Sequence, residues 1–453
     1  MPSTYRTYFT NSSIYGSVSF QGMGSYSLNT YGARMATGQT WATGTYSNVI
    51  TSDSALTISN YESVSGITYN LVTSDGGLHW DLVVNAASPT RVFDATRALG
   101  NTPAGRAASI IDSTPGLSAL FTNLTTDQQL SNAASQTLPL LTGGSTAAVR
   151  GTMNSISNIV QARLDHVSGR ASGDSFLDDK NVWLKPFASR ADQNDRDGVA
   201  GFKADTYGLA AGVDGTLSPA LRIGGAFAYA SSNINGTSAD APQSNDVSIY
   251  QLIGYGSYAV DDRTNINFQA DVGQNTNKGN RQIAFTSSLA SSNYNSDTAH
   301  VGLGVGRIYQ LTSSTTLTPS LRADYTWIKD KSYSESGAGL LNLNVASRST
   351  DAFVLGIDGK LAHQLNDQTT LIANLGVGYD TINKQDAISA TFAGASNAAF
   401  VTYGINPSPW IGRAGAGAVY KLKNGFEITG RYDVEYRESF LNQTASANMR
   451  WSF

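Results

Sequence analysis

The chain has 453 residues, enough for roughly two or three ordinary domains or for one large barrel with an appendage. Charged residues make up only 14%, the hydrophobic fraction is 40% and the mean hydropathy is −0.20, so the apolar residues are dispersed. Nowhere do about 18 consecutive apolar residues occur, which excludes a membrane-spanning α-helix. A net charge of −4 does not indicate the basic surface that binds nucleic acids. The absence of cysteine excludes disulfides and thiolate metal sites.

Residues 1–85 are rich in Ser, Thr, Tyr, Gly and Asn, and they carry short β-prone runs separated by Gly, Asp and Ser. Such evenly spaced runs are typical of β-helix rungs or of a small sandwich. Asp75 and Asp81 form a closely spaced acid pair beside a turn, and we expect them to be solvated rather than catalytic. Residues 1–6 lack a basic region followed by an apolar one, so export requires that this chain be a fragment, a processed form or a mis-assigned start.

Residues 86–145 change to Ala, Leu, Asn and Gln at helical spacing, interrupted by prolines. The clearest helix is predicted at 146–168, after Gly144, where Ser145 or Thr146 can cap it. One arc of this helix is apolar: Met153, Ile156, Val160, Leu164 and Val167. The polar residues are Arg150, Asn154, Asn158, Gln161, Arg163 and Asp165. A helix this polar needs a partly wet partner, and a surface helix of a soluble domain is the alternative.

Residues 180–453 contain twelve strand candidates whose connections alternate between tight turns and long loops rich in Ser, Asn, Asp and Gly. Long loops are predicted near residues 191–202, 232–245, 276–293, 329–347 and 383–407. Short turns at one rim and long loops at the other are the asymmetry of an outer-membrane barrel. A Greek-key sandwich gives no reason for such regular alternation.

Within the strand candidates, apolar and polar side chains alternate. Near the C-terminus Phe426, Ile428, Tyr432, Val434 and Tyr436 share one parity, and Ala447, Met449, Trp451 and Phe453 share another face. A transmembrane barrel turns its apolar parity to lipid and its polar parity to a wet lumen. The sequence therefore predicts an all-β membrane protein with a 12-stranded antiparallel transmembrane β-barrel. By interpolation between smaller and larger barrels, it has room for roughly one helix, and the helix upstream is the natural occupant.

Several segments resemble the autotransporters, the type V secretion proteins of Gram-negative bacteria. The segments 182–187 and 207–214 look like the first two barrel strands of that family, and 449–453 looks like its terminal assembly signal. Upstream, residues 46–84 resemble the end of a β-helical passenger, and 91–140 resemble the helical stretch that joins a passenger to its pore helix.

The resemblance implies four parts: a C-terminal remnant of a β-helical passenger at 1–85, a helical linker at 86–145, a pore-plugging helix at 146–168 and the barrel at 180–453. Its implied function is to anchor a passenger and help export it across the outer membrane, with residues before the pore helix at the cell surface. The implied partners are outer-membrane lipid, the chain's own passenger and the barrel-insertion machinery, which would read Met449, Trp451 and Phe453. A monomeric barrel with no cofactor and no enzymatic activity is expected.

Other motifs lack the context that their chemistry needs. Residues 173–176 are similar to an esterase nucleophile block, but no α/β domain accompanies them. The glycines of 302–306 lie in an alternating strand rather than before a helix. The histidines, at 79, 166, 300 and 363, have no ligand spacing, so we expect no metal site.

Within the autotransporters, one subgroup cleaves itself inside the pore at an Asn-Asn pair. Here the corresponding pair is Asn158-Ile159, so we expect no such cleavage, and we expect Asn154 and Asn158 to hydrogen-bond the barrel wall. Arg150 and Arg163 are expected to pair with lumenal carboxylates, with Asp271, Asp324 and Glu435 as candidates. Three alternatives stay open: a porin-like channel, a surface adhesin whose binding passenger is mostly missing, and a non-functional gene fragment.

Overall fold

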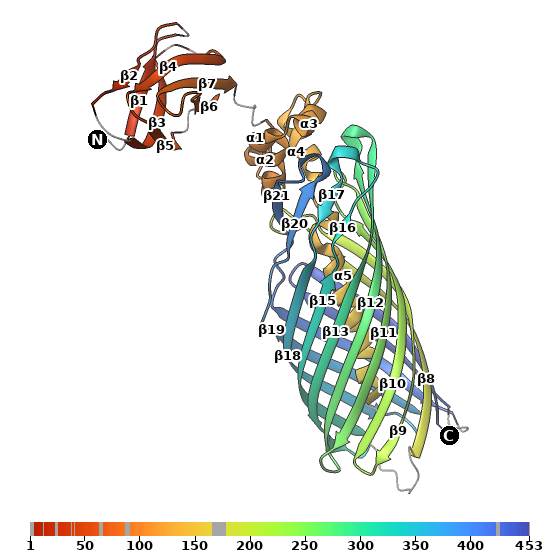
Figure 1. The fold of residues 1–453 in the computed structure, drawn as a ribbon. Coiled ribbons are helices and arrows are strands. Elements are labelled where there is room, and N and C mark those ends of the chain that lie inside the picture. The colour runs from red at the N-terminus through yellow and green to blue at the C-terminus, as the bar shows by residue number, and fades with distance from the viewer. Residues whose placement is uncertain are drawn as a thin grey trace. The chain divides into compact units, whose positions relative to one another are not determined.

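The computed structural model describes residues 4–11, 13–22, 26–37, 39, 41–62, 67–86, 91–164, 178–422 and 426–452. The chain divides into two compact units, Met1–Arg91 and Val92–Phe453. The first is a small β structure, and the second comprises helices and a β-barrel (Figure 1). We describe each unit by itself.

The first unit consists, in its described residues, of strands β1 (Thr4–Phe9), β2 (Val18–Phe20), β3 (Tyr26–Met35), β4 (Gly44–Ser52), β5 (Leu56–Tyr61), β6 (Ile67–Val72) and β7 (His79–Ala86). Parallel pairing joins β1 to β3, β3 to β5 and β2 to β4. Strand β7 pairs antiparallel with β4 and β6. Between the strands lies an aromatic and aliphatic core that includes Phe9, Tyr31, Ile50 and Leu82. The unit thus contains two small sheets, one parallel and one mixed, and its β-helix-like character stays a prediction.

The second unit begins with helices α1 (Arg91–Ala98), η1 (Thr102–Ala104), α2 (Gly105–Ser113), α3 (Pro115–Ser118), η2 (Ala119–Phe121), α4 (Asp127–Ser135), η3 (Leu140–Gly143) and α5 (Gly144–Leu164). Local signals explain their starts. Thr126 and Gln129 form a reciprocal capping box at α4, and Pro115 occupies the first turn of α3. Within η3, Leu141, Thr142 and Gly143 have positive φ, which turns the chain sharply into α5. Among the described helices, none has the length and hydrophobicity that a membrane-spanning helix requires.

The barrel of the described chain has twelve antiparallel strands: β8 (Asp178–Gln193), β9 (Phe202–Ser218), β10 (Leu221–Gly236), β11 (Gln243–Ala259), β12 (Thr264–Ile283), β13 (Ser288–Arg307), β15 (Thr315–Asp330), β18 (Arg348–Gln364), β19 (Thr369–Asp380), β22 (Trp410–Lys421), β23 (Phe426–Arg437) and β24 (Phe440–Ser452). Pairing of β24 with β8 closes the barrel, and the short β14 (Tyr309–Thr312) continues β13 along β15. The predicted fold class is confirmed.

Burial confirms the predicted parity. Phe426, Ile428, Tyr432 and Tyr436 of β23 are exposed on the outside of the barrel, and the intervening Glu427, Thr429 and Glu435 are buried in the lumen. A closed barrel satisfies every backbone group of its strands internally, so its outer face can be apolar. Lipid and a wet lumen therefore impose the alternation that the sequence carries.

Short connections at 219–220, 260–263, 313–314 and 365–368 form one rim, which we call the turn rim. At the opposite loop rim the connections 194–201, 237–242, 331–347 and 381–409 are longer, whereas 284–287 and 438–439 are short. This rim contains a small sheet and short helices. Their elements are η4 (Ala284–Thr286), β16 (Tyr333–Ser334), η5 (Gly339–Leu341), β17 (Leu343–Val345), β20 (Ala387–Phe392), η6 (Ala393–Ala395) and β21 (Ala399–Tyr403). Strands β16, β17, β20 and β21 pair in that order.

The prediction of a long loop at 276–293 is wrong. Strands β12 and β13 stay paired out to Ile283 and Ser288, with only η4 between them. Ser and Asn made this stretch look like a loop, but the inward side chains of Asn277, Arg281 and Ile283 are buried. Packing against distant segments therefore overrides the local turn signal.

Candidate functional site

Helix α5 lies inside the barrel and packs its apolar side against the wall formed by β8–β11 (Figure 1). Val149, Met153, Ile156 and Val160 of α5 are almost completely buried there. The facing wall is rich in small side chains, namely Ala204, Ala210, Ala226, Ala228 and Ala230. Small residues on the wall leave the volume that a helix needs, so the lumen is filled by close packing on this side.

Two lumenal aromatic rings lie over glycines of the neighbouring strand. Trp183 is paired in register with Gly212, and Phe187 with Gly208. A Cβ at Gly212 would lie 2.6 Å from the Trp183 ring, and one at Gly208 would collide with Phe187. Glycine is thus required where a ring crosses the backbone. This contact explains the first two of the segments singled out in the sequence.

Polar contacts fix the first turn of α5 at the loop rim. The Thr146 hydroxyl donates to Asp330 at 3.1 Å and accepts from Arg348 at 2.7 Å, while Asn245 donates to Ser145 at 3.1 Å. These partners come from three different strands, β15, β18 and β11. The start of the helix is therefore held from several sides of the barrel.

Further along α5, small hydroxyls meet polar groups of the wall. Ser155 lies 3.1 Å from the Thr444 hydroxyl and accepts from Asn442 at 3.2 Å. Asn154 donates weakly to Glu435 at 3.4 Å. With its amide oxygen turned toward Arg322, Gln161 accepts from that guanidinium at 2.8 and 2.9 Å. The helix is bonded to the wall over its described length.

The structure places the predicted helix residues unequally. Asn154 and Gln161 contact the wall as described, and Asn158 lines a cavity. Asp165 and Phe453 lie outside the described residues, as do His166, Val167 and the block at 173–176, and the side chains of Arg163 and Leu164 are not described. Met449 and Trp451 are exposed on the outer surface of β24, where the Trp451 ring stacks on Phe426.

The expected pairing of Arg150 with a wall carboxylate does not occur among the described ion pairs. Asp271 and Asp324 both bind the ring of His300, at 2.7 and 2.9 Å. Glu435 pairs with Arg437 at 3.3 Å. The three candidate carboxylates are therefore bound by partners on the barrel wall itself. The alternation of residues along a single strand shows which side chains face the lumen, but not which of them pair with one another.

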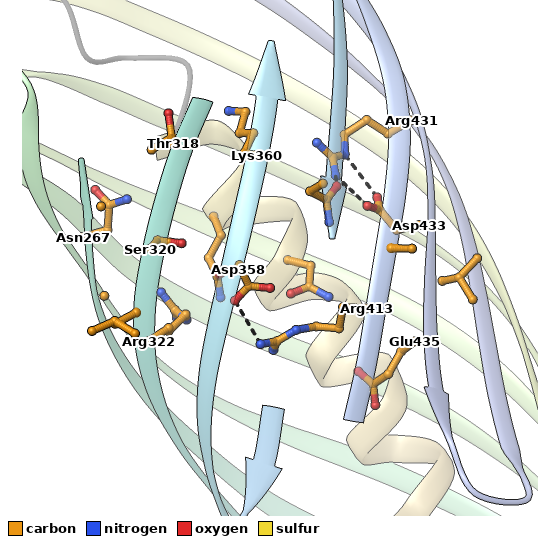
Figure 2. Close-up of a pocket in the computed structure, with 18 of the residues that line it drawn as sticks. Asn267, Thr318, Ser320, Arg322, Asp358, Lys360, Arg413, Arg431, Asp433 and Glu435 are labelled. Atoms are coloured by element: carbon orange, nitrogen blue, oxygen red, sulfur yellow. Dashed lines mark hydrogen bonds and ion pairs between the residues drawn. The ribbon is translucent and has the colours of Figure 1, made fainter. Parts of the chain in front are cut away.

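The polar side of α5 faces a charged wall across a cavity of about 160 Å³ (Figure 2). Arg413 reaches Asp358 at 3.0 Å, and Arg431 reaches Asp433 at 2.6 Å. The cavity is also lined by Asn158, Gln161, Arg322, Lys360 and Glu435. Charged side chains on one wall and alanines on the other make the lumen strongly asymmetric around the helix. This asymmetry was not predicted from the sequence. Alternation along a strand distinguishes side chains that face the lumen from those that face lipid, but it does not show which strands of the barrel are charged and which are rich in alanine on the lumen side.

Helices α1–α4 pack on the loop-rim sheet to form a unit that we call the cap, made of α1–α4, β16, β17, β20, β21 and the tip of β12–β13 (Figure 1). Its core contains Ile111, Leu117, Phe121, Leu130, Ile283, Leu343, Ile388 and Phe392. Asp112 of α2 accepts from the backbone N–H groups of Val92 and Phe93, which satisfies the first turn of α1. Tyr333 stacks on Tyr294, and burial raises the pKa of Tyr333. Nothing in the sequence alone located this assembly.

No group of three His, Cys, Asp or Glu side chains within the described residues is placed to hold a metal ion. Residues 302–306 lie within β13, which rules out a phosphate-binding loop before a helix. The site is therefore a lumen occupied by a helix, whose chemistry is packing, hydrogen bonding and charge.

Comparisons with known proteins agree with this architecture. The family model for the autotransporter beta-domain matches residues 182–433. Outer membrane protein A of Rickettsia conorii is 30% identical over 322 residues, which cover 66% of this chain and 16% of that protein. Outer membrane protein B of Rickettsia prowazekii is 27% identical over 234 residues, 49% of this chain and 14% of that protein. The chain thus spans less than a fifth of these curated relatives.

Among solved structures, the translocator domain of the autotransporter NalP from Neisseria meningitidis matches with a TM-score of 0.53 and 16% identity. The match covers 67% of this chain and 98% of that domain. It supports the barrel fold.

Proposed function

The chain belongs to the autotransporter family, whose β-domain is an outer-membrane transport unit, and we propose that its barrel exports the segment before α5 and then anchors it at the cell surface. The path of the chain through the barrel carries this proposal. Helix α5 starts among the loop-rim ends of β11, β15 and β18 and extends toward the turn rim, where β8 begins opposite Thr216. The chain thus crosses the lumen once, as expected after export of what precedes it.

The difference between the two rims supports the orientation that we propose. In bacterial outer-membrane barrels the short turns face the periplasm and the longer loops face outward. Applied here, the loop rim, the cap and residues 1–143 lie outside the cell. We accordingly assign 1–85 as the remnant of the passenger, 86–145 as the linker, 146–168 as the pore helix and 180–453 as the barrel.

The outer surface of the barrel supports the proposed partners. Exposed Tyr207, Tyr229, Trp410 and Trp451 supply the interfacial aromatic residues that lipid headgroups favour. We propose that Met449, Trp451 and Phe453 present an apolar edge to the barrel-insertion machinery before β24 closes on β8. The closed sheet leaves no free barrel edge, which favours a monomer.

The absence of an Asn-Asn pair at Asn158-Ile159 supports a passenger that stays covalently attached. Asn158 lines the cavity beside α5, and Ile159 is buried. A single full-length band on denaturing gels of outer membranes is the expected result; a separate fragment of the barrel alone would contradict it.

Because the chain has no cysteine, its topology can be tested by single cysteine substitutions in cells that express it behind a working signal peptide. Ser74→Cys in the first unit and Ala239→Cys at the loop rim should react with a membrane-impermeant maleimide on intact cells. Asp367→Cys at the turn rim is the matched control, and it should react only after the outer membrane is opened. All three positions are exposed. Labelling of Asp367→Cys alone on intact cells would overturn the orientation.

A further inference from the structure

Beside α5, a series of cavities that share lining residues runs from the turn rim toward the loop rim. Four cavities of about 160, 30, 50 and 60 Å³ follow one another. The first and second share Asn158 and Glu435 in their linings, the second and third share Arg150 and Asn154, and the third and fourth share Ala147. The first two cavities lie on the charged side of the helix, whereas the third and fourth are also lined by Gln193 of β8 and by apolar side chains such as Pro407.

The two ends of the series lie near the two rims. The first cavity is lined by Asn265 and Ile308, beside the turn at 260–263. The fourth is lined by Lys384, Asp386 and Gly404 from the long connection between β19 and β22. A polar cavity large enough for one probe sphere holds water, and a water occupies about 30 Å³ of liquid volume. The smallest of the four cavities therefore has room for at least one water molecule.

Positive charge dominates the lining of this smallest cavity. Three arginines line it, Arg150, Arg413 and Arg437, against the carboxylates of Asp324 and Glu435. Arg413 and Arg437 are neutralised by Asp358 and Glu435. Arg150 takes part in none of the ion pairs that the structure describes, and it lines three consecutive cavities. A guanidinium keeps its charge at all physiological pH values.

We propose that this series of cavities is an anion-selective path, which conducts small inorganic anions past α5 while the helix remains in the lumen. Rings of Arg or Lys side chains select anions in other pores. Arg150 is the selectivity residue, because it lines three consecutive cavities and takes part in none of the described ion pairs. Cavities of this size leave no room for large solutes, so the barrel is a low-conductance channel in addition to an anchor.

The test is conductance of the purified full-length chain in planar lipid bilayers under a potassium chloride gradient. The wild-type protein should give a small steady current whose reversal potential lies toward that of chloride. Arg150→Glu should shift the preference to potassium, and Arg150→Gln should reduce the chloride preference severalfold. Arg190→Gln, which removes an arginine on the outer surface of β8, is the matched control and should leave the selectivity unchanged. A current with the same selectivity in folded Arg150→Glu protein would overturn the proposal.

A current would also flow if α5 left the lumen. A crosslink between α5 and the barrel distinguishes conduction past the seated helix from conduction through an emptied lumen. The hydroxyls of Thr152 on α5 and Thr206 on β9 lie 3.5 Å apart, and neither residue lines the four cavities. In a Thr152→Cys/Thr206→Cys variant, whose cysteines are the only two in the chain, a disulfide would hold the helix in place. Chloride-selective current should persist after oxidation; loss of current on oxidation, with recovery on reduction, would show that conduction requires the helix to leave.

Discussion

Arg281 and Glu335 form an ion pair inside the cap, with side chains only 0% and 1% exposed. The guanidinium Nη2 lies 2.5 Å from the carboxylate Oε2, and Nε lies 3.2 Å from Oε1. Arg281 also donates to the carbonyls of Gln136 and Leu341, and Glu335 accepts from the Leu343 N–H at 2.8 Å. The pair thus links the barrel hairpin β12–β13 to the end of the linker helices and to the loop-rim sheet.

Breaking this pair should loosen the cap without opening the barrel. Glu335→Gln leaves a guanidinium buried without a counter-charge, which costs about 3–5 kcal/mol for a buried pair. We expect the cap to become cleavable by protease at the cell surface while the barrel keeps its heat-modifiable mobility on gels. Arg281→Met/Glu335→Leu removes both charges and should recover part of the loss. A single variant as resistant as the wild type would contradict this assignment.

The contact between Trp183 and Gly212 should make glycine indispensable at that position. A Cβ added at Gly212 would lie 2.6 Å from the Trp183 ring and 2.8 Å from the Gly225 carbonyl oxygen, so backbone must shift. Overpacking of this kind costs about 1–3 kcal/mol. We expect Gly212→Ala to lower the yield of folded barrel in outer membranes, measured as the heat-modifiable fraction. Gly225→Ala, whose Cβ would lie 3.8 Å from its nearest neighbour, is the control and should fold normally.

Truncation on the apolar side of α5 should loosen the helix in the lumen. Ile156 is 1% exposed against the β8–β11 wall, and Ile→Ala at a packed site costs about 2–5 kcal/mol. We expect Ile156→Ala to increase tryptic cleavage after Arg150, which is shielded while the helix is seated. Leu99→Ala removes an exposed side chain and should leave the cleavage rate unchanged. Equal cleavage in the two variants would argue against helix seating by this face.

The barrel could be predicted from the sequence because each strand separates lipid from lumen at every second residue, as Glu427 and Ile428 do on β23. The position of α5 in the lumen could be predicted because the helix has one apolar and one polar side. The cap could not, because Arg281 looks like a loop residue until Gln136 at the end of α4 and Glu335 of the loop rim bury and bind it. The sequence also did not reveal that Arg150 has no ion pair among those described, since His300 and Arg437 bind the carboxylates that were the predicted partners.

Low pH should loosen the turn between β6 and β7 in the first unit. The Asp75 carboxylate accepts hydrogen bonds from the His79 N–H at 2.9 Å, the Leu78 N–H at 3.1 Å and the Thr73 hydroxyl at 2.9 Å, and it meets the His79 ring at 2.5 Å. The backbone N–H and the ring of His79 do most to hold the pKa of Asp75 well below its usual range.

Because the folded state depresses this pKa, the carboxylate stabilises the turn fully above its unfolded pKa of about 3.9, and the contribution is lost as pH falls toward the folded pKa. We expect the amide groups of Leu78 and His79 to lose protection from hydrogen exchange below about pH 4, after correction for the intrinsic rates. Protection at Leu82 in the core of the same unit is the internal control and should stay constant. Asp75→Asn should show weakened protection at these two amides already at neutral pH, with little further change on acidification; a turn in that variant as pH-sensitive as the wild type would assign the effect to another group.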